Sequence, residues 1–170
     1  MLRYKIIVQY DGTAFYGWQT QKSVRTIQGE LELALKKIND SSNVRVHGAG
    51  RTDTGVHAIG QVAHFDLKTS LDPFQLKDAL NGNLPPDIRI MKCNEVSKDF
   101  HARFSAIRRH YNYRIRTDGF ILDKSYTWNV DSIDKKNLND VATLLIGEND
   151  FTSFSKNNEN LDHRRCIVYE

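Results

Sequence analysis

Residues 48–60 have the sequence GAGRTDTGVHAIG, with four glycines, two threonines, one arginine, one aspartate and one histidine. So many glycines and so few large apolar residues predict a loop. Apolar and polar residues alternate in NVRVH (43–47) before it and in GQVAHFD (60–66) after it, which predicts two strands joined by this loop. The loop is therefore a plain turn, a metal site, a phosphate cradle or the position of an acidic group.

The elements around this loop are predicted to follow the order strand, helix, strand, strand, helix, strand. Residues 4–10 alternate as a strand, and apolar residues recur at helical spacing over 27–38, with Ser23 or Thr26 available as N-cap. A second helix is expected to begin at Asp72-Pro73 and to end at Asn81-Gly82, before a strand over 88–93. This order predicts an α+β, ferredoxin-like (split βαβ) unit with an antiparallel sheet. Both helices should cover one face and leave the other free.

A second copy of this pattern is predicted to begin after Phe104. RRHYNYRIR (108–116) alternates as a strand, Leu138 to Leu145 form a helical stripe closed by Gly147, and HRRCIVYE (163–170) is expected to be another strand. The expected organisation is a tandem of ferredoxin-like units, with 1–104 as the half that carries the loop and 105–170 as the start of an incomplete second half. An incomplete half leaves a sheet edge unpaired, which favours association.

Composition is that of an ordinary folded protein, with 39% hydrophobic and 26% charged residues and a net charge of +3. The apolar runs are too short for a membrane span or a signal peptide, so a cytoplasmic location is expected. Cys93 and Cys166 lie far apart and are expected to be reduced, partly buried thiols. Residues 101–117 hold five arginines, two histidines and three aromatics without an acid, a pattern that suits RNA or a solvated strand with distant carboxylate partners.

Asp53 is the residue of the loop on which the function depends. An aspartate in a glycine-rich loop commonly caps nearby N–H groups, whereas the neighbouring Arg51 and two threonines favour an ionised, presented carboxylate. A metal site with His47 and His57 lacks a recurrent ligand spacing. The loop also lacks the Gly-Lys-Ser/Thr ending of a phosphate-binding loop. A carboxylate that acts covalently is used in glycosyl transfer, among other reactions.

Several stretches together resemble the tRNA pseudouridine synthase A family. They are YDGTAFYGWQTQ (10–21), GAGRTDTGVHAIGQVAHFD (48–66), ALNGNLPPDIRI (79–90), DFHARFSAIRRHYNYRI (99–115) and DFTSFS (150–155). The resemblance implies a pseudouridine synthase fold of two ferredoxin-like halves around a cleft. It also implies isomerisation of uridine to pseudouridine in the anticodon stem-loop of tRNA, at about positions 38 to 40, by base flipping. It implies homodimers and no cofactor or metal.

The resemblance also assigns roles to single residues. Asp53 matches the catalytic aspartate, Arg51 an arginine that extrudes the target base, and Tyr111 the tyrosine that stacks on the uracil. Arg108 and Arg109 are expected to contact phosphates. The basic partner of the aspartate belongs to a later motif in the family, which this sequence does not include. A catalytically incomplete tRNA-binding fragment is therefore the alternative function.

Overall fold

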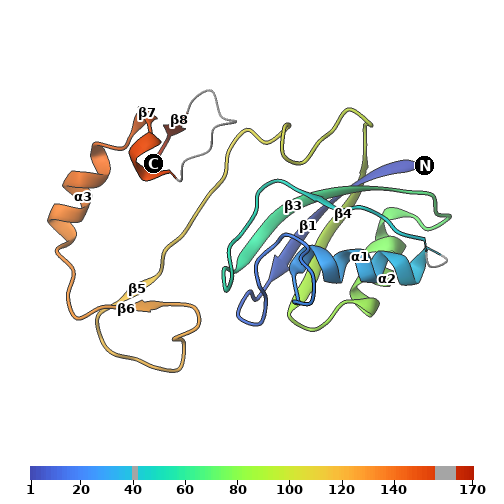
Figure 1. Ribbon diagram of the computed structural model, residues 1–170, viewed down its shortest axis with the longest axis horizontal. Coiled ribbons are helices and arrows are strands. Elements are labelled where there is room, and N and C mark those ends of the chain that lie inside the picture. The colour runs from blue at the N-terminus through green and yellow to red at the C-terminus, as the bar shows by residue number, and fades with distance from the viewer. Residues whose placement is uncertain (40–41, 156–163) are drawn as a thin grey trace. The chain divides into compact units, whose positions relative to one another are not determined.

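The computed structural model describes residues 1–39, 42–155 and 164–170, which divide into two units, 1–112 and 113–170. The first unit follows the predicted order of elements (Figure 1). Its elements are β1 (Leu2–Tyr10), α1 (Ile27–Ile38), β2 (His47–Gly48), β3 (Ala58–Leu67), α2 (Pro73–Asn83) and β4 (Ile88–Val96). The strand expected over 43–47 forms only at its end.

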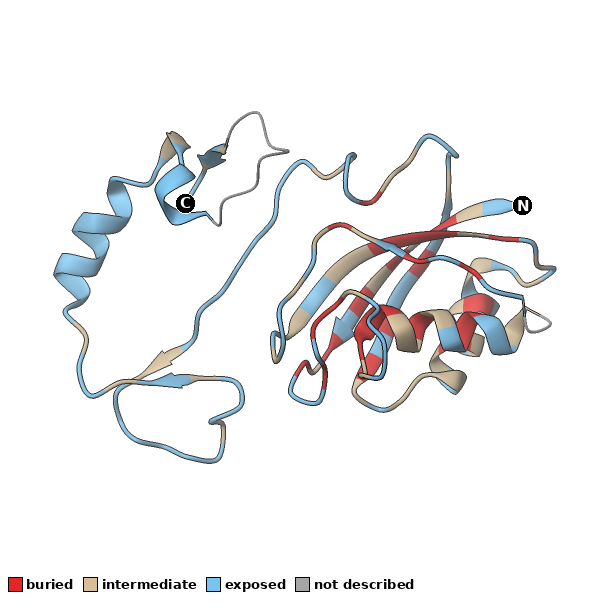
Figure 2. Ribbon diagram, viewed as in Figure 1, coloured by how far each residue is buried: buried red, intermediate tan, exposed pale blue. Residues whose placement is uncertain are grey.

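The four strands of the first unit form one antiparallel sheet in the order β2-β3-β1-β4. Both helices lie against one face of it (Figure 1), as expected. Alternate residues of β1 are buried (Figure 2) and belong to the hydrophobic core. They pack with Phe65 of β3, Leu31 and Leu35 of α1, and Leu76 and Leu80 of α2. The α+β class and the antiparallel sheet predicted from the sequence are thus present.

Both helices begin after a predicted N-cap residue, whereas α2 does not end where predicted. The Thr26 hydroxyl accepts a hydrogen bond from the Gly29 N–H at 3.3 Å and caps α1. Asp72 caps α2 in a capping box with Gln75. However, α2 continues past Gly82 to Asn83, and the Leu84 N–H donates to the Leu80 carbonyl at 3.0 Å. The expected stop at Asn81-Gly82 is wrong because Gly82 keeps a helical backbone.

The opposite face of the sheet is not fully free, in contrast to the prediction. His64 of β3 is 2% exposed, and its Nδ1 accepts the N–H of Ala102 at 3.1 Å. Arg3 of β1 donates to the Phe100 carbonyl at 2.9 Å and pairs with Asp66 at 2.7 Å. The segment after β4 therefore covers this part of the sheet.

The second unit contains β5 (Ile115–Arg116), β6 (Trp128–Asn129), α3 (Lys135–Thr143), β7 (Gly147–Asp150), the 3-10 turn η1 (Thr152–Phe154) and β8 (Arg165–Val168). β5 pairs with β6 in parallel, and β7 with β8 antiparallel. The strand expected over 108–116 forms only as β5, and the expected helix ends at Thr143, before Gly147 opens β7. Within 113–155 and 164–170 no residue is classed as buried, so the alternation there has no core to fill. His163 of the expected last strand lies outside the described residues.

The two cysteines differ in environment. Cys93 of β4 is buried, and burial raises the pKa of its thiol to about 11. Cys166 of β8 is exposed, so the expectation that both thiols are partly buried is wrong for Cys166.

Candidate active site

Asp53 lies in the loop between β2 and β3, and its side chain is exposed, as is that of Arg51. The tip of the loop is closed by the main chain, because the Val56 N–H donates to the Asp53 carbonyl at 3.2 Å and Gly55 has φ 79°. Across the described ranges, no hydrogen bond or ion pair is made by the Asp53 carboxylate. The carboxylate is therefore not used as a cap and remains available for chemistry.

The two central strands hold the start of this loop. The Ala49 N–H donates to the Val62 carbonyl at 2.8 Å, and Gln61 Nε2 donates to the Gly50 carbonyl at 2.7 Å. The Tyr10 hydroxyl and the Thr52 hydroxyl share a hydrogen bond of 2.9 Å. These contacts fix the backbone on both sides of Arg51 and leave its guanidinium exposed.

The glycine-rich loop after β1 holds the remaining part of the Asp53 loop, from Thr52 to Gly55. The Trp18 N–H donates to the Thr52 carbonyl at 2.9 Å, and the Gly55 N–H donates to the Phe15 carbonyl at 3.2 Å. The two backbones meet so closely that a Cβ on Gly17 would lie 2.5 Å from the Thr52 oxygen, and one on Gly12 would lie 2.0 Å from the Val56 oxygen. The loop over 11–21 therefore supports the Asp53 loop, and glycine is required where the backbones of the two loops come into contact.

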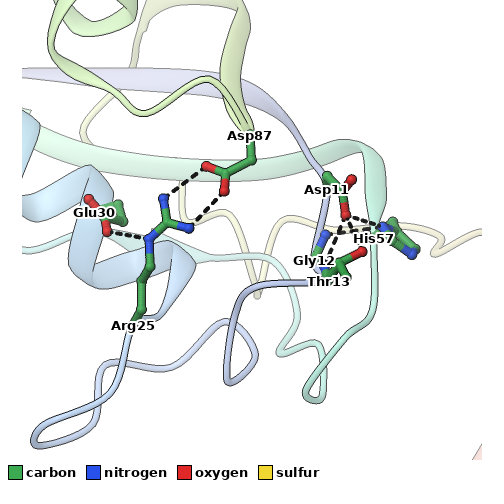
Figure 3. Close-up of polar contacts among 7 residues, drawn as sticks. All are labelled: Asp11, Gly12, Thr13, Arg25, Glu30, His57 and Asp87. Carbon is green, nitrogen blue, oxygen red and sulfur yellow. Dashed lines mark hydrogen bonds and ion pairs between the residues drawn. The ribbon is translucent and has the colours of Figure 1, made fainter. Parts of the chain in front are cut away.

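Two buried aromatic residues and a half-buried ion pair hold the loop over 11–21 in place. Phe15 and Trp18 are at most 2% exposed, as expected of scaffold residues, whereas Tyr16 is 57% exposed and is not part of the core. Arg25 donates to both carboxylate oxygens of Asp87 at 2.7 and 2.9 Å and to Glu30 at 2.8 Å (Figure 3). Its guanidinium also lies 4.1 Å from the centre of the Phe15 ring.

His57 joins the two loops at the start of β3. Its Nδ1 lies 3.1 Å from the Gly12 nitrogen and accepts that N–H in the neutral ring, whereas the contact with Asp11 requires a proton on Nδ1 (Figure 3). Asp11 Oδ1 lies 3.1 Å from the same nitrogen and accepts hydrogen bonds from Thr13 N–H and Oγ1–H at 2.9 and 2.6 Å. His57 thus serves a local hydrogen-bond network.

Arg109 connects the arginine- and tyrosine-rich segment (101–117) to the Asp53 loop. Arg109 Nη2 and Nε donate to the Ala49 carbonyl at 2.9 and 3.3 Å. Arg108 is exposed, and Tyr111 is 73% exposed. The structure therefore brings Arg109 to the Asp53 loop, and it leaves the Tyr111 ring accessible to a ligand.

The described part of the chain contains neither a group of side chains placed to bind a metal nor a helix able to span a membrane. There, no three His, Cys, Asp or Glu side chains, His47, His57 and Asp53 included, are arranged to hold a metal ion. No helix in the same residues is long and apolar enough to cross a bilayer.

Sequence reasoning did not find Gln61 and Arg25 as residues that hold this site, or the contact between Tyr10 and Thr52. Tyr10 and Arg25 have partners 42 and 62 residues away, and Gln61 reaches Gly50 across 11 residues, but nothing in the local pattern distinguishes these side chains from ordinary strand or loop residues.

Comparison with known proteins connects this geometry to a family. The tRNA pseudouridine synthase family model matches residues 6–105, which include the loop over 11–21, the Asp53 loop and the segment after β4 up to Ser105. The chain belongs to the tRNA pseudouridine synthase family. The match spans more than half of the chain and contains every described contact of the Asp53 loop except those of Arg109.

Individual members of the tRNA pseudouridine synthase family are similar over nearly the whole chain. A tRNA pseudouridine synthase A of Agrobacterium fabrum is 43% identical over 160 residues, covering 91% of this chain and 60% of its own length. One of Maridesulfovibrio salexigens is 43% identical over 173 residues (100% and 64%), and one of Rhodopseudomonas palustris is 48% identical over 158 residues (91% and 64%). The chain thus spans less than two thirds of these relatives.

Proposed function

We propose that the chain is a tRNA pseudouridine synthase that isomerises uridine to pseudouridine in the anticodon stem-loop, at about positions 38 to 40, by flipping the base. The observation that carries this proposal is the anchored loop between β2 and β3. Its backbone is hydrogen-bonded by β3 and by the loop over 11–21, and its Thr52 hydroxyl by Tyr10, while the side chains of Arg51 and Asp53 remain exposed. The family match over 6–105 covers this loop.

Asp53 is the catalytic residue in this proposal. The reaction breaks the C–N bond between uracil N1 and ribose C1′, turns the base, and forms a C–C bond between C1′ and uracil C5. The hydrogen on C5 leaves as a proton, and N1, freed from C1′, takes up a proton. A carboxylate can add to uracil C6, take up C1′ or abstract the 2′ proton, and each route requires an ionised group close to the flipped nucleotide.

Binding roles are proposed for four further residues. Arg51, two positions before Asp53, extrudes the target base, and the exposed Tyr111 ring stacks on the uracil. Arg108 and Arg109 contact phosphates. Arg109 also holds the Ala49 carbonyl, so a phosphate bound to it would be coupled directly to the Asp53 loop.

At the level of architecture, we propose that the chain forms tandem ferredoxin-like halves and works as a cytoplasmic homodimer on tRNA. The strand order of the first unit supports the first half, and the proposal for the second half rests on the sequence pattern after Phe104. Exposed apolar side chains of α3 and its C-terminal flank, among them Leu138, Val141 and Leu144, supply surface suited to association.

Release of tritium from tRNA labelled at C5 of uridine tests the proposed reaction. The wild-type chain should release tritium, and Asp53→Asn, which keeps the size of the side chain and removes its charge, should abolish release. Asp78→Asn on the exposed surface of α2 is the matched control and should behave as wild type. Sustained release by Asp53→Asn would overturn the assignment of Asp53.

A tRNA-binding fragment without catalysis is the second candidate function. It is favoured by one observation: in the described residues, no cation pairs with the Asp53 carboxylate. This candidate predicts tRNA binding that weakens steeply with salt, with no tritium release by the wild-type chain. The same assay therefore separates the two functions.

A further inference from the structure

We propose that Tyr10 is a positioning residue of the active site, and that it orients Asp53 through its hydrogen bond to Thr52. The catalytic consequence rests on the proposed pseudouridine synthase activity, whereas the effect on the loop does not.

Tyr10 connects the rigid core directly to the Asp53 loop. It is the last residue of β1, is 3% exposed and belongs to the main hydrophobic cluster, next to the Trp18 ring at 6.2 Å between centroids. Its hydroxyl lies 2.9 Å from Thr52 Oγ1. A hydroxyl on a buried ring has very little freedom of position, so it can serve as a fixed reference point for the loop.

Thr52 is held at two separate atoms. Tyr10 holds its side-chain oxygen, and the Trp18 N–H holds its carbonyl at 2.9 Å. Two contacts on one residue fix both its rotation and its translation. Because Thr52 directly precedes Asp53, its orientation determines where the Asp53 Cα lies and the direction in which the Asp53 side chain leaves the backbone, and Asp53 itself has no described side-chain contact.

The tyrosine hydroxyl acts here as a hydrogen-bonding group and not as an acid. Burial raises the pKa of Tyr10 above its usual value, so the hydroxyl stays protonated through the neutral range. Tyr4 provides an internal comparison on the same strand and the same face. It is 2% exposed, and among the described residues its hydroxyl makes no side-chain hydrogen bond.

Tyr10→Phe and Thr52→Val each remove one hydroxyl from this pair while keeping the shape of the side chain. Hydrogen exchange followed by mass spectrometry on the full chain measures the order of the loop without requiring activity. In both variants, amides that depend on the Thr52 and Gly55 contacts should exchange about 3- to 10-fold faster, as expected for loss of one hydrogen bond. Tyr4→Phe is the matched control and should leave exchange in 49–57 unchanged.

Kinetics of tritium release then test the link to catalysis. Tyr10→Phe should lower kcat about 10- to 100-fold with little change in KM for tRNA, because the carboxylate is misplaced while the RNA-binding side chains are unaffected. Thr52→Ser retains the hydroxyl and should keep most of the wild-type kcat. The double variant Tyr10→Phe with Thr52→Val should be no slower than the slower single variant, since both remove the same bond.

The outcomes separate this proposal from the proposed function. If wild type releases no tritium, the pseudouridine synthase activity fails, and hydrogen exchange still decides whether Tyr10 orders the loop. If wild type is active and Tyr10→Phe matches Tyr4→Phe in both exchange and kcat, the positioning role is wrong. Effects of Tyr10→Phe and Thr52→Val that multiply in the double variant also overturn it, because they would arise from separate interactions.

Discussion

Gly17 illustrates at the scale of one residue how the loop over 11–21 and the Asp53 loop depend on each other. Its φ of 81° disfavours any side chain, and a Cβ would lie 2.5 Å from the Thr52 oxygen. Gly17→Ala should therefore lower the free energy of unfolding by about 2 to 4 kcal/mol, combining backbone strain with a clash. Urea denaturation followed by circular dichroism measures this change.

Gly55→Ala is the control that separates these two effects. Gly55 has a nearly identical φ of 79°, yet nothing lies within 4 Å of its added Cβ. It should cost only about 1 to 2 kcal/mol, the backbone part alone. Equal losses for the two variants would show that the close approach to Thr52 contributes nothing to stability.

His64 makes stability depend on pH in a window set by its pKa. Burial lowers that pKa from 6.5 to about 4, and the nearby His101 and His47 act in the same direction. Between pH 6.5 and 4 the unfolded chain binds a proton that the folded chain rejects, so stability falls as the pH falls. Urea denaturation should show a loss of about 2 kcal/mol between pH 7 and pH 5.

The variant His64→Asn tests the origin of this loss. The asparagine oxygen can accept the Ala102 N–H in place of Nδ1, and it does not titrate. Its unfolding free energy should change clearly less between pH 7 and pH 5 than that of wild type. His47, whose pKa is also lowered by burial, contributes in the same direction. An unchanged pH dependence in His64→Asn would assign the whole effect to other groups.

At the scale of the element, α2 depends on its first turn. The Asp72 carboxylate accepts the N–H groups of Phe74 and Gln75 at 2.8 and 2.9 Å. Asp72→Ala should therefore lower the free energy of unfolding by about 1 kcal/mol. Asp78→Ala, on the exposed surface of the same helix, should change it by less than about 0.5 kcal/mol. A comparable loss in both variants would mean that charge on α2, rather than the cap, is responsible.

The sequence predicted the elements of the first unit because burial there follows their periods. Tyr4, Ile6 and Val8 alternate toward the helices as the pattern indicates. By contrast, the alternation over 108–114 does not form a strand, since a strand also requires a hydrogen-bonded neighbour, which local pattern does not specify. The contacts that hold the Asp53 loop were equally inaccessible, because Tyr10 and Thr52 are 42 residues apart and Arg109 and Ala49 are 60 apart.

At the scale of the molecule, the buried residues belong to one unit. Every buried hydrophobic side chain in the described residues lies between Tyr4 and Ala102. A chain of residues 1–112 should therefore fold alone, with a urea midpoint within error of the main transition of the full chain. Circular dichroism and urea denaturation of the shortened chain test this. An unfolded 1–112 would show that the second unit contributes to stability.

The anchoring of the Asp53 loop has a practical consequence for capturing RNA complexes. Its anchors are main-chain groups and the Thr52 hydroxyl, so side chains at positions 51 and 53 can be exchanged without altering the frame that presents them. Under the catalytic role proposed for Asp53, variants at this position should consequently hold unmodified substrate in the native pose. They would be suitable reagents for crystallising a trapped nucleotide and for pulling down target RNA from cell extracts.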